Sequence, residues 1–114
     1  MRFLCLYRSK NAETNKPPTQ QEMEAMGKLM QEMAQAGVLL GTEGCEPSAK
    51  GARIQVSSGS FAVNDGPFTD SNGLIGGYAV LKVNSKAEAI DWSKRFLAVV
   101  GEGESELRQL REMS

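Results

Sequence analysis

The chain has 114 residues, with 13 Lys and Arg against 14 Asp and Glu, so its formal net charge is −1. This length suits one domain over residues 1–114 with a hydrophobic core of its own. The chain has no histidine, which excludes Ser-His-Asp and Cys-His catalysis and histidine metal sites. Its basic residues are scattered, and we therefore expect no binding of nucleic acid.

The first predicted element is a buried strand at Phe3–Tyr7, a short apolar run that Arg8 closes. This run is shorter than the ~7–15 apolar residues of a signal peptide and the ~20 of a membrane-spanning helix. We therefore expect a cytoplasmic protein that contacts no membrane. Cys5 in this strand and Cys45 in a later loop form no CxxC motif. We expect neither a metal site nor a cofactor, and a disulfide between the two is not favoured.

A helix is predicted next. Thr19-Gln20-Gln21-Glu22 has the pattern of a capping box at a helix start, and Gly37 is a typical residue after a helix end. Between them, methionines recur at helical spacing, at positions 23, 26, 30 and 33. Flexible thioethers suit a binding surface, but one apolar stripe on a helix of this length is more typical of packing on a sheet. We interpret the stripe as core.

Further elements follow in chain order. The predicted segments are a strand at Val38–Leu40, a hairpin at 52–64 that turns at Ser58-Gly59-Ser60, a strand at Tyr78–Val83, and a helix from the capping box Ser85–Glu88 to Gly101. The tail at 104–113 fits two interpretations. Leu107 and Leu110, three apart, suggest a helix, whereas a position after a glycine-rich turn suggests a final strand.

Without the hairpin, this order predicts an α+β fold of the ferredoxin-like βαββαβ type, an antiparallel sheet with two helices on one face. The strands Phe3–Tyr7 and Tyr78–Val83 are apolar on both faces, but two helices can cover only one face. A second copy of the chain would cover the other. We therefore expect a homodimer packed sheet face to sheet face.

The main candidate for chemistry is Asp65-Gly66-Pro67-Phe68. A carboxylate that follows a strand and is held by Gly and Pro suits an acid or a base, although Asp and Gly are also common turn residues. Arg8 could bind an anionic substrate or pair with Asp65 or Glu43. Glu43 could serve a site or only a tight bend, and Tyr78 could offer its hydroxyl to a ligand or bury its ring. Asp70 lies in the same predicted group of loops and strand ends.

Asp65-Gly66-Pro67-Phe68 resembles the signature of the DGPF-motif branch of the YCII-related proteins. The likeness extends along most of the chain, including Arg2–Tyr7, Ala36–Leu40, Gly51–Arg53, Gly76–Tyr78, Lys86–Phe96 and Glu106–Gln109. The resemblance implies a dimeric α+β barrel, a strand for the tail, and a cleft between sheet, hairpin and partner chain.

The chain also departs from the family pattern at two places. The His-Asp pair proposed as catalytic in related YCII proteins cannot be carried over, because this chain has no histidine. The branch commonly has a Lys-Glu pair after the motif, where this chain has Asn72 and Gly73, and Asp70 stands where Glu is usual.

Two hypotheses about function follow. The first is a small-molecule enzyme using acid–base chemistry such as elimination, isomerisation or hydrolysis, with Asp65 transferring the proton and Arg8, Glu43, Tyr78 and Asp70 binding the substrate. The second is a non-catalytic dimer that binds a small ligand or has a regulatory role, which the resemblance links to sigma-factor systems. A deep pocket that holds Asp65 would favour the enzyme. A shallow surface, with Asp65 bound to turn amides, would favour the second.

Overall fold

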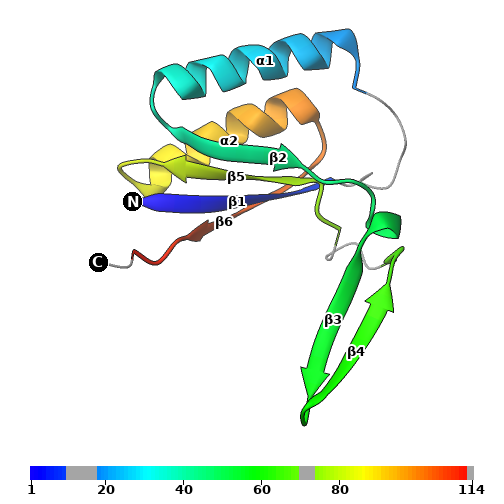
Figure 1. Ribbon diagram of the computed structural model, residues 1–114. Helices are drawn as coiled ribbons and strands as arrows, with labels where there is room; N and C mark the ends of the chain where they lie inside the picture. Colours follow the sequence, from blue (N-terminus) through cyan, green and yellow to red (C-terminus); the bar gives the residue numbers. More distant parts are fainter. Residues whose placement is uncertain (10–17, 70–73, 113–114) are drawn as a thin grey trace.

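The computed structural model describes residues 1–9, 18–69 and 74–112 (Figure 1). Its larger sheet is four-stranded, in the order β2-β5-β1-β6, and its smaller sheet is the hairpin β3-β4. The elements are β1 (Arg2–Ser9), α1 (Gln20–Gln35), β2 (Leu39–Gly44), the 3₁₀ helix η1 (Ser48–Lys50), β3 (Ala52–Ser57), β4 (Ser60–Asp65), β5 (Gly77–Lys82), α2 (Lys86–Val100) and β6 (Gly103–Gln109).

This arrangement confirms the predicted ferredoxin-like α+β fold. All neighbouring strands of the larger sheet are antiparallel, and β1 lies between β5 and β6. Both helices cover the same face of the sheet (Figure 1). The tail forms the edge strand β6. This confirms the strand that the family resemblance implied, and the alternative interpretation as a helix was wrong. Neither described helix has the length and apolarity that crossing a bilayer requires.

The helix ends follow the sequence signals. The Thr19 hydroxyl accepts a hydrogen bond from the Glu22 amide at 3.1 Å, and the Ser85 hydroxyl accepts one from the Glu88 amide at the same distance. In α2 the Glu88 carboxylate also reaches back, but to the amide of Asn84 at 3.0 Å. Gly37 follows α1 with φ at +71°, a left-handed conformation that favours glycine.

The core lies between the helices and the sheet. Its buried apolar residues are Phe3, Leu29, Met33, Val38, Leu81, Val83 and Ala89. The methionine stripe of α1 reaches this core only in part, because Met33 is buried and Met26 and Met30 are half-buried, whereas Met23 is 56% exposed. The interpretation of the whole stripe as core is therefore correct for its C-terminal end and wrong for Met23.

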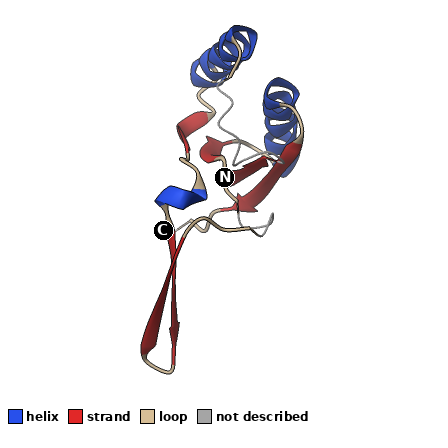
Figure 2. Cartoon of the chain, turned by 90° about the vertical axis from the view of Figure 1, so that its right-hand side faces the viewer, coloured by secondary structure: helices blue, strands red, loops and turns tan. Residues whose placement is uncertain are grey.

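The hairpin β3-β4 projects away from the sheet and the helices (Figure 2). Its turn is at Ser58 and Gly59, with φ at +51° and +79°. Two successive residues with positive φ give the turn that matches the twist of a tight hairpin. The predicted hairpin is thus confirmed, and Asp65 is the last residue of its second strand.

Candidate ligand pocket

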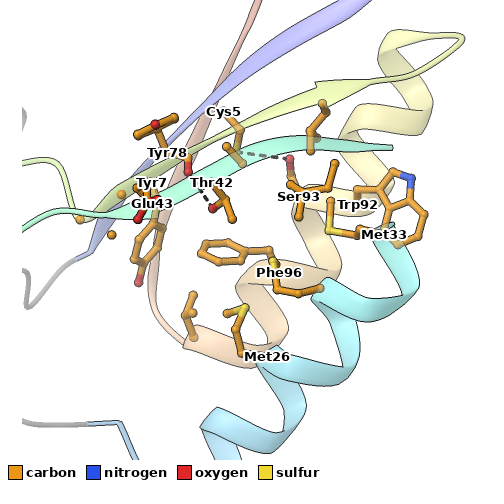
Figure 3. A pocket seen from close by; sticks show the side chains of 18 residues that line it. Cys5, Tyr7, Met26, Met33, Thr42, Glu43, Tyr78, Trp92, Ser93 and Phe96 are labelled. Atoms are coloured by element: carbon orange, nitrogen blue, oxygen red, sulfur yellow. Dashed lines mark hydrogen bonds between the residues drawn. The ribbon is translucent and has the colours of Figure 1, made fainter. Parts of the chain in front are cut away.

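A pocket of about 430 Å³ lies between the two helices and the helix-facing side of the sheet (Figure 3). Cys5, Tyr7 and Ala79 belong to the strands that form its floor. Met26 and its neighbours on α1 form one wall, and Phe96 with Trp92 on α2 forms the other. Most of this lining is apolar and aromatic, as is typical of small-molecule sites.

The position of Tyr7 is set by an aromatic contact and by two glycines. Its ring meets the Phe96 ring edge to face, with centroids 5.1 Å apart and an interplanar angle of 83°. A Cβ at Gly76 would lie 3.0 Å from Tyr7 Cδ2, and a Cβ at Gly103 would lie 2.8 Å from Tyr7 Cε1. The absence of side chains at both positions therefore makes room for the ring at the pocket floor.

The polar groups at the pocket are mostly neutral. The thiol of Cys5 is 2.7 Å from the hydroxyl of Ser105 and 3.8 Å from that of Ser93. The Thr42 hydroxyl donates to the Tyr78 carbonyl oxygen at 2.8 Å. Glu43, which is exposed, is the one charged residue of the pocket lining among the described residues. Such a lining suits an uncharged ligand, because a buried charge without a partner is costly.

Glu43 and Tyr78, two of the residues expected near Asp65, are direct partners between β2 and β5. Tyr78 is also the partner of Leu6 on β1, while Cys5 is the partner of Ala79. Because cross-strand partners point to the same face, Glu43 and Tyr78 occupy strand positions that face away from the helices, as Figure 3 shows for Tyr78. We call this face the open sheet face. Atoms of both residues also contribute to the lining of the pocket.

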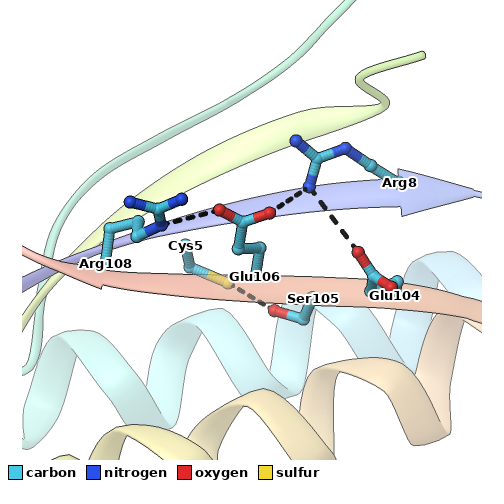
Figure 4. A network of polar contacts seen from close by, with 6 residues as sticks. All are labelled: Cys5, Arg8, Glu104, Ser105, Glu106 and Arg108. Atoms are coloured by element: carbon cyan, nitrogen blue, oxygen red, sulfur yellow. Dashed lines mark hydrogen bonds and ion pairs between the residues drawn. The ribbon is translucent and has the colours of Figure 1, made fainter. Parts of the chain in front are cut away.

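Arg8 lies on the same open sheet face, where it meets acidic residues of β6 (Figure 4). Its guanidinium is 3.0 Å from the Glu106 carboxylate and 3.7 Å from that of Glu104. Arg108 also bonds Glu106, at 2.8 Å. The hydrogen bond from Arg108 and the positive charges of Arg108 and Arg8 lower the pKa of the Glu106 carboxyl.

The sequence reasoning missed these acidic partners of Arg8. The residue pattern of the tail alone fits both a helix and a strand, and only a strand aligns its alternate residues on one face. The alternation of charged residues at 104, 106 and 108 was the signal that could have found them.

Asp65 ends β4 at the root of the hairpin, where it is exposed, and it is not among the residues that line the pocket. The residues after it hold this root to η1. The Gly66 amide donates to the Gly51 carbonyl oxygen and the Phe68 amide to the Ser48 hydroxyl, each at 3.0 Å. The Arg53 guanidinium lies 3.9 Å from the centroid of the Phe68 ring. The motif thus has a clear structural role.

Asp70, predicted to bind substrate, lies outside the described residues. Within the described part of the chain, no group of three or more His, Cys, Asp or Glu side chains could hold a metal ion.

The fold and the pocket together define a ferredoxin-like α+β domain with a small-molecule-sized cavity between its helices and sheet. The family model for the YCII-related domain matches residues 1–114. The chain therefore belongs to the YCII-related family, as its sequence suggested. Membership of the DGPF-motif branch stays a prediction.

The chain was also compared with curated protein sequences and with solved structures. Among the curated protein sequences, none matches the chain. A similar fold occurs in 5-chloro-2-hydroxyhydroquinone dehydrochlorinase (TftG) from Burkholderia phenoliruptrix AC1100, solved in complex with 2,5-dihydroxybenzoquinone. The two proteins are 10% identical, with a TM-score of 0.51, over 99% of this chain and 96% of that one. At this identity the likeness shows the fold alone.

Proposed function

We propose that this protein binds a small uncharged ring compound in the pocket between its helices and sheet. The observation that carries the proposal is the cavity of about 430 Å³, a size within the roughly 300–1,000 Å³ of ligand pockets. Its aromatic and methionine side chains favour a ring, and the hydroxyls of Tyr7 and Ser93 offer neutral hydrogen-bonding groups. The hydroxylated ring bound to TftG is a ligand of the same general kind.

We further propose that the protein is a cytoplasmic homodimer joined through its open sheet faces. The partner pairs Leu4–Val80 and Leu6–Tyr78 place apolar side chains on that face, and Tyr78 remains 39% exposed. In a two-fold dimer the open sheet face of each subunit would cover these side chains of the other subunit. The link to sigma-factor systems stays a prediction from the family resemblance.

The binding proposal is tested by isothermal titration calorimetry with 2-naphthol, a neutral two-ring compound. We expect a Kd of about 100 μM, which corresponds to roughly 0.5 kcal/mol for each of its non-hydrogen atoms. Trp92 is the one tryptophan of the chain and lines the pocket. Quenching of its fluorescence on binding is therefore a second measurement of the same event.

The variant Ala79→Leu extends a side chain from the pocket floor, and we expect it to weaken binding about tenfold or more. Ala62→Leu adds the same atoms at an exposed position of the hairpin and should leave the Kd unchanged. Circular dichroism of both variants checks that the fold is kept. Equal affinity of Ala79→Leu and the unaltered protein would contradict the assignment of the pocket.

Catalysis is a second candidate function, favoured by the fold that this chain shares with a dehydrochlorinase. Asp65 is exposed on a root that hydrogen bonds fix, outside the lining of the pocket. The first reaction to assay is chloride release from 5-chloro-2-hydroxyhydroquinone, because TftG shares the fold and loss of HCl needs a base to take the proton. We expect Asp65→Asn to keep the fold and to abolish chloride release. Asp91→Asn, a change of the same kind at an exposed position of α2, is the control. Release by Asp65→Asn at the full rate would contradict this role, and no release by the unaltered protein would leave ligand binding as the function.

A further inference from the structure

One buried polar side chain of the pocket lining has only a long contact within the chain. Among the described residues, Ser93 is the one polar residue that is buried, with 7% of its surface exposed. It lies on α2 one helical turn after Ala89, a buried residue of the core, and it lines the pocket. An apolar residue is more usual at such a position, because burying a hydroxyl costs free energy unless a hydrogen bond compensates it.

The Ser93 hydroxyl keeps most of its hydrogen-bonding capacity. Its contact within the described part of the chain is with the sulfur of Cys5, at 3.8 Å (Figure 3). The same sulfur lies much closer to the Ser105 hydroxyl, at 2.7 Å. A hydroxyl can both donate and accept hydrogen bonds, and a thiol is a weak partner in either role. The Ser93 oxygen can therefore still bind a polar group of a molecule in the pocket.

The pocket is better suited to supply that polar group from a ring than from water. A water molecule is held well in a cavity only where it meets about 2–4 polar groups. The lining of this pocket is mostly apolar, and it includes Met33, Trp92 and Phe96. A hydroxyl carried by an aromatic ring meets both conditions, because the ring packs on apolar side chains while the hydroxyl bonds Ser93.

We propose that Ser93 recognises a hydroxyl group on the bound ring, so that phenols are the ligand class of this pocket. The inference rests on the binding function proposed above, and it adds the ligand class and the residue that selects it. The phenol hydroxyl points toward α2 beside Cys5. Its ring fills the apolar remainder of the pocket, where Phe96 and Met26 lie.

A cycle of two proteins and two ligands tests this role. The ligands are 2-naphthol and 2-methylnaphthalene, which have nearly the same shape, and equilibrium dialysis measures the bound fraction of each. Ser93→Ala should raise the Kd of 2-naphthol about tenfold, because the phenol loses its hydrogen-bonding partner. It should leave the Kd of 2-methylnaphthalene unchanged or lower it, since a methyl group leaves the Ser93 hydroxyl without a partner.

Two further variants locate the effect. Ser105→Ala removes the other hydroxyl that contacts Cys5, but Ser105 is not among the residues that line the pocket. It is the matched control and should leave the Kd of 2-naphthol unchanged. Tyr7→Phe removes a hydroxyl from the pocket floor and should not change the ratio of the two Kd values. A ratio that changes in Tyr7→Phe and not in Ser93→Ala would overturn the role of Ser93.

The stability of the unliganded protein separates ligand recognition from a structural role. Ser93→Ala removes a poorly satisfied buried hydroxyl from a helix and should raise the Tm by about 2–4 °C. A lower Tm would show that this hydroxyl holds the fold through Cys5, which would overturn the proposal. Equal changes in the Kd of both ligands would also overturn it and leave the pocket standing. An unaltered protein that binds neither compound would overturn the proposed function, and this inference with it.

Discussion

Gly66→Ala is expected to release the root of the hairpin β3-β4 from η1 and to destabilise the protein strongly. A Cβ at this position would lie 1.7 Å from the carbonyl oxygen of Ser48 and 2.6 Å from its carbonyl carbon. These are backbone atoms, and the Ser48 oxygen also accepts the Gly51 amide at 2.9 Å, so they cannot move aside without breaking the turn. We expect a loss of about 3 kcal/mol in the free energy of unfolding, and a Tm lower by roughly 10 °C.

Gly27→Ala is the matched control, because it adds the same methyl group in a different setting. Gly27 lies within α1, and a Cβ there would meet nothing within 4 Å. Alanine should raise the free energy of unfolding by about 0.5–1 kcal/mol, since glycine disfavours the helix. The two substitutions should therefore move the Tm in opposite directions in a thermal unfolding experiment. A Gly66→Ala protein as stable as the unaltered one would show that this close approach does not hold the root of the hairpin.

The parts of the fold that were predicted from the sequence depend on neighbours in the chain. Thr19 and Glu22 are three residues apart, and one turn of helix brings the hydroxyl to the amide whatever the rest of the chain does. The turn at Ser58-Gly59 likewise needs only a left-handed conformation at two adjacent residues. Local geometry of this kind explains why the helix starts and the hairpin were correct.

The pocket could not be predicted in the same way, because it forms from residues far apart in the sequence. Tyr7 and Phe96 meet only after β1 and α2 have packed, and Met26 reaches the same cavity from a third element. The spacing of the methionines in α1 does not indicate which of them face a cavity and which pack in a filled core. The acidic partners of Arg8 lie on the strand β6. The residue pattern of this short segment also suited a helix, so it did not by itself identify these partners.

Leu81→Ala is expected to cause the second large loss of stability. Leu81 is 2% exposed, and its partners on the neighbouring strands are Phe3 and Leu39. Truncation removes buried methyl groups and leaves a cavity beneath the helices, which costs about 2–5 kcal/mol. Since this core lies within one chain, the loss relative to the unaltered protein should be the same at low and high protein concentration.

Val80→Ala is the matched change one residue away on β5. Val80 is the partner of Leu4 on the open sheet face, and alternation along the strand places it opposite to Leu81. If a second copy covers this face, the truncation weakens the dimer, and its cost grows as protein concentration rises and the dimer forms. Thermal unfolding at about 1 and 100 μM should therefore give a concentration-dependent loss for Val80→Ala and a constant one for Leu81→Ala. A loss for Val80→Ala that does not change with concentration would contradict the sheet-face dimer, because its side chain would then pack only within its own chain.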